Sequence, residues 1–336
     1  MSDNSHSTMS PLLTVDGLTV DYGLKGVSLR ALNDVSFELR PGEAVALVGE
    51  SGSGKTTTAM AIAGLLTPNA RVTGGEVRYR GTPLPIDDDA AMRPRRWSDI
   101  SVVFQGAMNA LNPVHRIINQ VAEPCMLKGM SRDKALARAG ELLELVGIPA
   151  DRGAAYPHQL SGGMRQRVMI AMALACRPSI VIGDEPTTAL DVINQAQVLK
   201  LLVELRSRFN LALILITHDL SVVAESCDRV MIMYAGRIVE DGTVADIFAE
   251  PKHPYTRLLI ESIPEPAKGK RMLRPIPGDP PTLMKRPSGC PFHPRCPFAM
   301  AICAVEIPHL DRCGQGRVAC HLHNSLTQAD KVSANA

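Results

Sequence analysis

A glycine-rich segment between an apolar run and a helix-like stretch constrains the fold of this chain most. Residues 48–61 read VGESGSGKTTTAMA and contain three glycines, which a fold keeps where a turn or a close approach to the backbone requires them. Residues 49–56, GESGSGKT, match the pattern G-x-x-x-x-G-K-[ST]. The strand and the helix that this pattern requires are predicted on either side, so the segment indicates a loop that binds phosphate.

The chemistry of this loop favours a nucleoside triphosphate. Successive backbone amides form an anion-binding nest, to which the N-terminus of the following helix adds its positive end. Lys55 is expected to reach the terminal phosphates and Thr56 to ligate Mg²⁺. The residues of the loop expected to bind nucleotide are Gly49, Ser51, Gly52, Ser53, Gly54, Lys55, Thr56 and Thr57. An ordinary glycine turn is the alternative, and the flanking elements weigh against it.

Two adjacent carboxylates supply the second half of such a site. Residues 179–186, SIVIGDEP, read as a buried strand that ends in Asp184 and Glu185. We expect Asp184 to hold Mg²⁺ through water and Glu185 to orient or deprotonate the attacking water. A solvated turn is the alternative for two neighbouring acids, and the phosphate-binding pattern favours the catalytic interpretation.

The order of strands and helices predicts an α/β fold. Strand-like runs fill residues 12–48, and two more follow the glycine-rich loop and its helix. Helix formers dominate residues 107–178. Beyond them, three buried strand-like runs, one of them residues 228–240, alternate with a helical stretch, which is typical of a parallel α/β core.

Composition bounds the class of protein. Of the 336 residues, 45% are hydrophobic and 21% charged, and the formal net charge is only +2, so we expect a soluble globular protein without strong steering toward nucleic acid. No apolar run reaches the roughly 18 residues of a membrane span, and the N-terminus lacks the pattern of a signal peptide. Residues 1–10 and 324–336 are predicted to be a disordered N-terminus and a frayed tail.

A second predicted helix N-terminus that could bind an anion narrows the choice of protein family. Residues 160–167 read LSGGMRQR, in which Ser161 looks like an N-cap and two glycines allow close approach. At this point residues 12–250 resemble the ATP-binding-cassette (ABC) ATPases, in which the LSGG segment of one subunit closes over the nucleotide of another. The resemblance implies a phosphate-loop core with an antiparallel β subdomain and a helical subdomain, within a domain spanning residues 11–250. It assigns nucleotide contacts to Ser161, Gly162 and Gly163.

Further residues take their expected roles from this resemblance. Tyr22 looks like the aromatic that stacks on adenine, and Gln105 like the glutamine that senses Mg²⁺ and the membrane subunits. Asp191 belongs to a segment, residues 189–191, that looks like the loop crossing the dimer interface, and His218 looks like the histidine that contacts the γ-phosphate. Singly, these residues would read as a surface aromatic or as polar groups at strand ends, but their order and spacing favour the catalytic set Glu185, His218 and Gln105.

Several longer runs are similar to the D-type ATPase subunit of dipeptide and oligopeptide importers. They are HQLSGGMRQRVMIAMALACRPS, DEPTTALDV, THDLSVVAESCDRVMIMYAGRIVE and HPYTRLL. The resemblance implies two membrane permease subunits, a second ATPase subunit, an extracytoplasmic solute-binding protein and a place on the cytoplasmic face of the cell membrane. Gly106 and Ala107 stand where that family usually has Asp-Pro, and Gly183 replaces a more usual alanine. The first departure lies where the resemblance places the contact with the permease, so it leaves the identity of that partner open.

A proline- and cysteine-rich extension is predicted over residues 251–323. A proline-rich linker begins at Pro251, and five of the eight cysteines lie in the last 47 residues. A nucleotide-hydrolysing chain without a signal peptide works in a reducing compartment, so a metal site is a better interpretation than disulfides. The candidate ligands are Cys290, Cys296, Cys303 and Cys320. The spacing fits neither zinc knuckles nor common ferredoxins, so a [4Fe-4S] cluster, zinc and free thiols all stay open, with Cys313 outside the site.

Two other classes of function compete with a peptide importer. Soluble cassette ATPases that act on nucleic acid or ribosomes usually carry two cassettes or a long coiled-coil insertion, whereas this chain has one phosphate loop and one LSGG segment. A sensor without hydrolysis would be expected to lack the catalytic acid, and Glu185 is present. Related importers carry nickel, glutathione or sugars, so the transported solute stays open.

Overall fold

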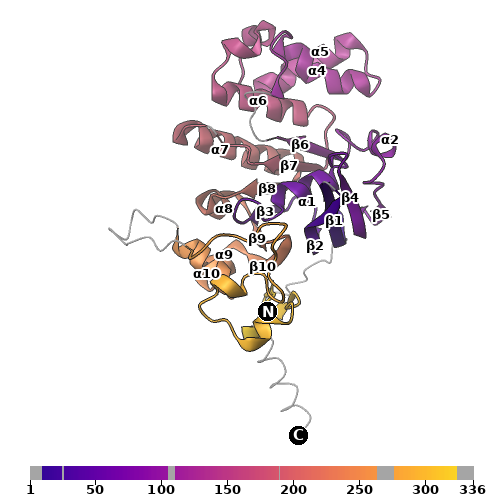
Figure 1. Cartoon of the computed structure of the whole chain (residues 1–336). Helices are drawn as coiled ribbons and strands as arrows, with labels where there is room; N and C mark the ends of the chain where they lie inside the picture. The colour runs from indigo at the N-terminus through magenta and orange to yellow at the C-terminus, as the bar shows by residue number, and fades with distance from the viewer. Residues whose placement is uncertain (1–9, 25, 105–109, 189, 263–275, 324–336) are drawn as a thin grey trace, which may run out of the picture.

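The computed structural model describes residues 10–24, 26–104, 110–188, 190–262 and 276–323. Figure 1 shows a small antiparallel sheet beside a larger sheet, a group of helices at one end, and the C-terminal segment at the other. The predictions of a disordered N-terminus and a frayed tail lie outside the described residues, apart from Ser10.

The small sheet confirms the predicted antiparallel subdomain. Its strand order is β2-β1-β4-β5, and every neighbouring pair is antiparallel. Buried and more exposed residues mostly alternate along β1, as expected for a sheet with one face on the core. The strands are β1 (Leu13–Leu24), β2 (Val27–Leu39), β4 (Ala70–Tyr79) and β5 (Thr82–Pro83).

The large sheet carries the parallel core. Its order is β11-β12-β10-β9-β3-β8-β7-β6, with parallel pairing from β9 through β6. Every residue of β3 is buried, because successive side chains pack against the small sheet on one side and the C-terminal elements on the other. The parallel strands are β3 (Ala44–Val48), β6 (Ile100–Val103), β7 (Ile180–Asp184), β8 (Ala212–Thr217) and β9 (Arg229–Tyr234).

Helices cover the sheet and form the predicted helical region. α4, α5 and α6 pack on one another through a shared apolar cluster and lie together at the top of Figure 1. Two short 3-10 turns, Ala150–Ala154 and Pro157–Gln159, connect α5 to α6. The helices up to α8 are α1 (Lys55–Ile62), α2 (Asp89–Met92), α4 (Ile117–Leu127), α5 (Arg132–Leu145), α6 (Gly162–Ala173), α7 (Val192–Phe209) and α8 (Leu220–Ser226).

Two predictions about the end of the cassette are wrong. Residues 228–240 form two antiparallel strands, β9 and β10 (Arg237–Thr243), because Ala235 and Gly236 adopt positive φ angles of 47° and 79° and turn the chain back. The segment from Pro251 is no simple linker, because α9 (Val244–Ala249) is followed by α10 (Pro254–Glu261), which begins at a proline that suits the first helical position.

The C-terminal extension is continuous with the core. Its strands β11 (Asp311–Cys313) and β12 (Gly316–Val318) add to the large sheet, where β12 pairs with β10. Besides α10, the extension contains short 3-10 turns at His293–Arg295 and Ala301–Ala304. In the described part of the chain, no helix is both long enough and apolar enough to cross a bilayer.

One carboxylate joins three strands at this end of the sheet. Asp241 on β10 is almost fully buried and accepts hydrogen bonds from Arg229 of β9, at 3.0 Å to each oxygen, and from Arg317 of β12, at 2.6 Å. Two guanidinium groups therefore compensate one buried charge, and the contact fixes the extension to the cassette.

We expect Asp241→Asn to lower the free energy of unfolding by about 2–3 kcal/mol. This loss is smaller than that for breaking a fully buried ion pair, because the side chains of Arg229 and Arg317 are still partly exposed to solvent. Asp34→Asn is the matched control, because Asp34 is exposed and lies 3.5 Å from Arg237, so its loss is expected to change stability by less than about 1 kcal/mol. Urea denaturation of both variants measures the difference, and equal losses would contradict this account.

Candidate nucleotide site

The glycine-rich loop lies between β3 and α1, as the sequence predicts. Gly52 and Gly54 adopt φ angles of 77° and 107°, which favour glycine. A Cβ atom at Gly49 would overlap the carbonyl oxygen of Met233 on β9. The loop backbone is therefore packed directly against the neighbouring strand, and it ends where Lys55 begins α1.

Lys55 lies folded against its own loop. Its Nζ donates to the carbonyl oxygens of Gly49 at 2.7 Å and Glu50 at 2.9 Å, and lies 3.4 Å from Ser53 Oγ. Burial lowers the pKa of this ammonium, while nearby carboxylates oppose that change. A desolvated cation inside a loop of backbone amides is suited to an anion of high charge.

Thr56 and Asp184 meet across the ends of α1 and β7. Thr56 Oγ1 donates to Asp184 Oδ1 at 3.1 Å, and burial raises the pKa of the Asp184 carboxyl. A hydroxyl and a carboxylate at this separation are oxygen ligands of the kind that Mg²⁺ prefers, so the donor set fits the expected ion. The third predicted ligand, Gln105, lies outside the described residues.

Glu185 and His218 are also brought together. The Glu185 carboxylate accepts a hydrogen bond from Thr188 Oγ1 at 2.9 Å, and its Oε1 lies 3.2 Å from His218 Nδ1. Glu185 has a positive φ of 45°, and its N–H donates to the carbonyl of Ile216 on β8. A non-glycine residue in this conformation is uncommon and points to a functional constraint on the direction of the side chain.

The small sheet contributes one predicted residue to the loop. Tyr22 on β1 places its hydroxyl 3.5 Å from Thr57 Oγ1 in the first turn of α1. An aromatic residue from the small sheet therefore lies beside the first turn of α1, and its role in stacking on a base stays a prediction.

The LSGG segment forms the predicted helix start. Ser161 caps α6, and its Oγ accepts the N–H of Met164 at 3.3 Å. Gly163 packs so closely on Asn194 that a Cβ would overlap the amide of that side chain, and Asp191 accepts the N–H of Asn194 at 2.9 Å. Gly163, Asn194 and Asp191 are therefore in direct contact with one another through Asn194. Within the described ranges, no hydrogen bond or ion pair connects residues 161–163 to the glycine-rich loop.

The four candidate thiols line one small cavity of the extension. Cys290, Cys296, Cys303 and Cys320 all border it, together with Phe292 and His253, whereas Cys313 lines a different hollow. Burial raises the pKa of Cys290 to about 11 and that of Cys320 to about 12. The cysteines are free, and in the part of the chain that the structure describes no three His, Cys, Asp or Glu side chains are grouped so as to hold a metal ion. The thiols converge, but the metal site stays a prediction.

Three residues at the phosphate-binding loop were not predicted from the sequence: Glu50, Tyr255 and Arg295. Arg295 donates two hydrogen bonds to the Glu50 carboxylate, at 2.6 and 3.0 Å, and the Glu50 N–H donates to Tyr255 Oη at 2.9 Å. The motif leaves position 50 undefined, and the cysteine spacing gives no reason to expect the extension at the triphosphate site. The run HPYTRLL, which contains Tyr255, was the one available signal.

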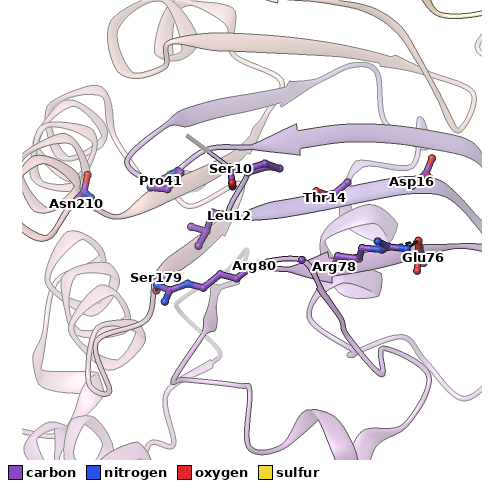
Figure 2. Close-up of a pocket in the computed structure, with 12 residues that line it drawn as sticks. Ser10, Leu12, Thr14, Asp16, Pro41, Glu76, Arg78, Arg80, Ser179 and Asn210 are labelled. Atoms are coloured by element: carbon purple, nitrogen blue, oxygen red, sulfur yellow. Dashed lines mark hydrogen bonds and ion pairs between the residues drawn. The ribbon is translucent and has the colours of Figure 1, made fainter. Parts of the chain in front are cut away.

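A hollow of about 690 Å³ lies elsewhere on the molecule. It is bordered by residues in or next to β1 and β4 of the small sheet and by Pro41, Ser179 and Asn210, which precede the parallel strands β3, β7 and β8. It therefore lies at the edge of the large sheet opposite the glycine-rich loop. Figure 2 shows Arg80 reaching toward Ser179, to which it donates at 3.3 Å. Arg78 forms an ion pair with Glu76 there, so these opposite charges compensate each other in the hollow.

Comparisons with known proteins agree with this geometry. The model of the ABC transporter family matches residues 32–188, and that of the oligopeptide/dipeptide transporter C-terminal region matches residues 239–303. The chain is 47% identical to the oligopeptide transport ATP-binding protein OppD of Salmonella typhimurium, over 95% of this chain and 97% of that protein. It is 45% identical to the dipeptide transport ATP-binding protein DppD of Bacillus subtilis, over 98% and 99%.

A solved structure of an ABC transporter cassette is similar to the cassette part of this chain. The dimeric structure of MJ0796, a bacterial ABC transporter cassette, has a TM-score of 0.62 and 30% identity, and covers 69% of this chain and 98% of its own. The phosphate loop, the paired acids, the capped LSGG helix and these similarities lead to one conclusion: this chain belongs to the ABC transporter family of ATPases.

Proposed function

We propose that this chain is the ATP-hydrolysing subunit that powers import of dipeptides or oligopeptides through a membrane ABC transporter. The observation that carries the proposal is that one chain combines an ABC transporter cassette with a region that matches the oligopeptide/dipeptide transporter C-terminal model, and that its relatives are named for peptide transport. Nickel, glutathione and sugar importers of the same kind are the alternatives, which uptake assays on the assembled complex distinguish.

Residues 49–57 bind the phosphates of ATP. Backbone amides of the loop and the N-terminus of α1 donate to phosphate oxygens, and Lys55 exchanges its carbonyl partners for the β- and γ-phosphates. Thr56, Gln105 and Asp184 would hold Mg²⁺, which supplies charge stabilisation for the phosphoryl group when it is bound. Tyr22 stacks on the base.

Glu185 and His218 act on the γ-phosphate side. Glu185 orients the attacking water and takes its proton, because it follows the last residue of β7, Asp184, and lies next to the expected Mg²⁺ ligand. His218, 3.2 Å from that carboxylate, contacts the γ-phosphate. Thr188 holds the second carboxylate oxygen and so restricts the direction in which Glu185 accepts.

The assembly completes the site. Ser161, Gly162 and Gly163, joined through Asn194 to Asp191, close over nucleotide held by a second ABC ATPase subunit. Two permease subunits and an extracytoplasmic solute-binding protein complete the transporter, and the chain lies peripherally on the cytoplasmic face of the membrane. No nucleic-acid partner is proposed.

The extension holds a metal centre in this proposal. Cys290, Cys296, Cys303 and Cys320 would ligate a [4Fe-4S] cluster, with zinc as the alternative, and the role would be structural. The support is the convergence of four buried or half-buried thiols on one cavity that excludes Cys313. A shared centre would stabilise their thiolate forms, which burial alone disfavours.

Glu185→Gln is expected to retain ATP binding and to slow hydrolysis by about 10²–10⁴-fold, because only proton transfer is lost. Phosphate release by the assembled transporter measures turnover, and titration with ATP measures binding. Glu204→Gln on the exposed face of α7 is the control and should hydrolyse ATP normally. Near-normal turnover in Glu185→Gln would reject its catalytic role.

Lys55→Ala is expected to weaken ATP binding by about 10–100-fold, because it removes a charged donor to the terminal phosphates. Lys200→Ala, which alters an exposed lysine of α7, is the control. Equilibrium titration of both variants with ATP checks the difference. An unchanged affinity in Lys55→Ala would count against the assignment of the phosphate loop.

Cys296→Ser is expected to lower the metal content of anaerobically purified protein and to disorder the extension, whereas Cys313→Ser should leave both unchanged. Iron, sulfide and zinc analysis identifies the centre, and broad visible absorption is expected for iron–sulfur. Metal-free protein in which all five C-terminal thiols titrate freely in the native state would refute the site.

A further inference from the structure

We propose that Arg295 and Tyr255 are positioning residues for the phosphate-binding loop, so that the affinity of the cassette for ATP depends on the C-terminal extension. Both hold Glu50, the residue that follows the first glycine of the loop. The inference rests on the proposed ATPase function, and it assigns to the extension a part in nucleotide binding in addition to any metal centre.

Arg295 holds the side chain of Glu50 from a fixed position. Its two terminal nitrogens form a bidentate pair with the carboxylate at 2.6 and 3.0 Å, and its side chain is only 6% exposed. The guanidinium is itself fixed, because Nε donates to the carbonyl of Pro277 at 2.8 Å and Nη1 donates to Tyr234 Oη at 3.2 Å. A buried planar fork of this kind defines both distance and direction.

Tyr255 holds the backbone of the same residue. Its hydroxyl accepts the Glu50 N–H at 2.9 Å, and its ring is fully buried. The ring packs against Tyr234, with centroids 4.7 Å apart, and against Phe292, at 5.3 Å. Phe292 lies between the first two cysteines of the extension, so this aromatic cluster connects the thiol-lined cavity to the loop.

The remaining backbone group of Glu50, its carbonyl, contacts the phosphate-binding lysine. The Glu50 carbonyl accepts a hydrogen bond from Lys55 Nζ at 2.9 Å. The N–H, the carboxylate and the carbonyl of one loop residue are therefore held by Tyr255, Arg295 and Lys55 respectively. A shift of Glu50 would displace both the amides that receive phosphate and the starting position of the lysine. Holding the loop before ATP arrives reduces the ordering that binding must supply.

This arrangement predicts a change in affinity rather than in the chemical step. Glu185 directly follows β7 and His218 directly follows β8, where they lie 3.2 Å from each other, whereas Arg295 and Tyr255 bond to Glu50 in the loop after β3. Loss of either positioning contact should therefore raise the KM and the Kd for ATP and leave kcat nearly unchanged. A merely structural role would lower stability without this split.

The test uses the assembled transporter and the full-length chain with four variants. Arg295→Gln and Glu50→Gln each remove one half of the ion pair, and Tyr255→Phe removes the hydroxyl while keeping the ring. We expect a rise of about five- to twentyfold in the Kd and KM for ATP in the two charge variants and a smaller rise in Tyr255→Phe, with kcat within about twofold. The double variant Glu50→Gln with Arg295→Gln should bind ATP little worse than either single variant, because both changes remove the same interaction.

Arg317→Gln is the matched control. It breaks an arginine–carboxylate pair of the same extension, to Asp241, without touching the loop, and should leave the Kd for ATP unchanged even if the protein melts earlier. Equal affinities in the wild type and all loop-contact variants that melt as folded proteins would overturn the inference, as would an equal loss in Arg317→Gln. Wild-type protein that binds no ATP would instead overturn the proposed function, so the two failures are distinguishable.

Discussion

The parallel pairing of β3 with β8 and of β8 with β7 is the constraint on which the site depends. It brings the carboxyl ends of three strands to one edge of the sheet, although they are far apart in the sequence. The loop after β3, the acids at the end of β7 and the histidine after β8 meet there for this reason. Each strand is buried on both faces, so a shift in register would move several of these groups at once.

Local patterns predicted the parts of the site that short segments define. The loop at 49–56, the acids at 184 and 185 and the cap at Ser161 each depend on a few neighbouring residues, and the structure places them on the expected elements. The antiparallel subdomain and the helical region were expected from the family resemblance and are confirmed. The roles of individual residues stay predictions.

Contacts between distant segments could not be predicted in this way. Glu50 and Arg295 are 245 positions apart, and neither belongs to a pattern that requires a partner. The turn between β9 and β10 was missed because Ala235 is an unusual residue at positive φ, and an unbroken apolar run read as one strand. The pairing of β12 with β10 depends on a buried carboxylate at 241 that serves two arginines, which no periodicity reveals.

The pairing of β12 with β10 has a consequence for the order in which the chain folds during synthesis. Until residues 316–318 have left the ribosome, β10 is an uncovered edge strand with several buried positions and unpaired backbone groups. The nascent cassette must therefore wait for nearly its whole length before that edge is covered. In the finished sheet the outermost strand is β11, which is only three residues long and exposes the charged side chain of Arg312. Few backbone groups are therefore left at this edge with which a strand of another chain could pair.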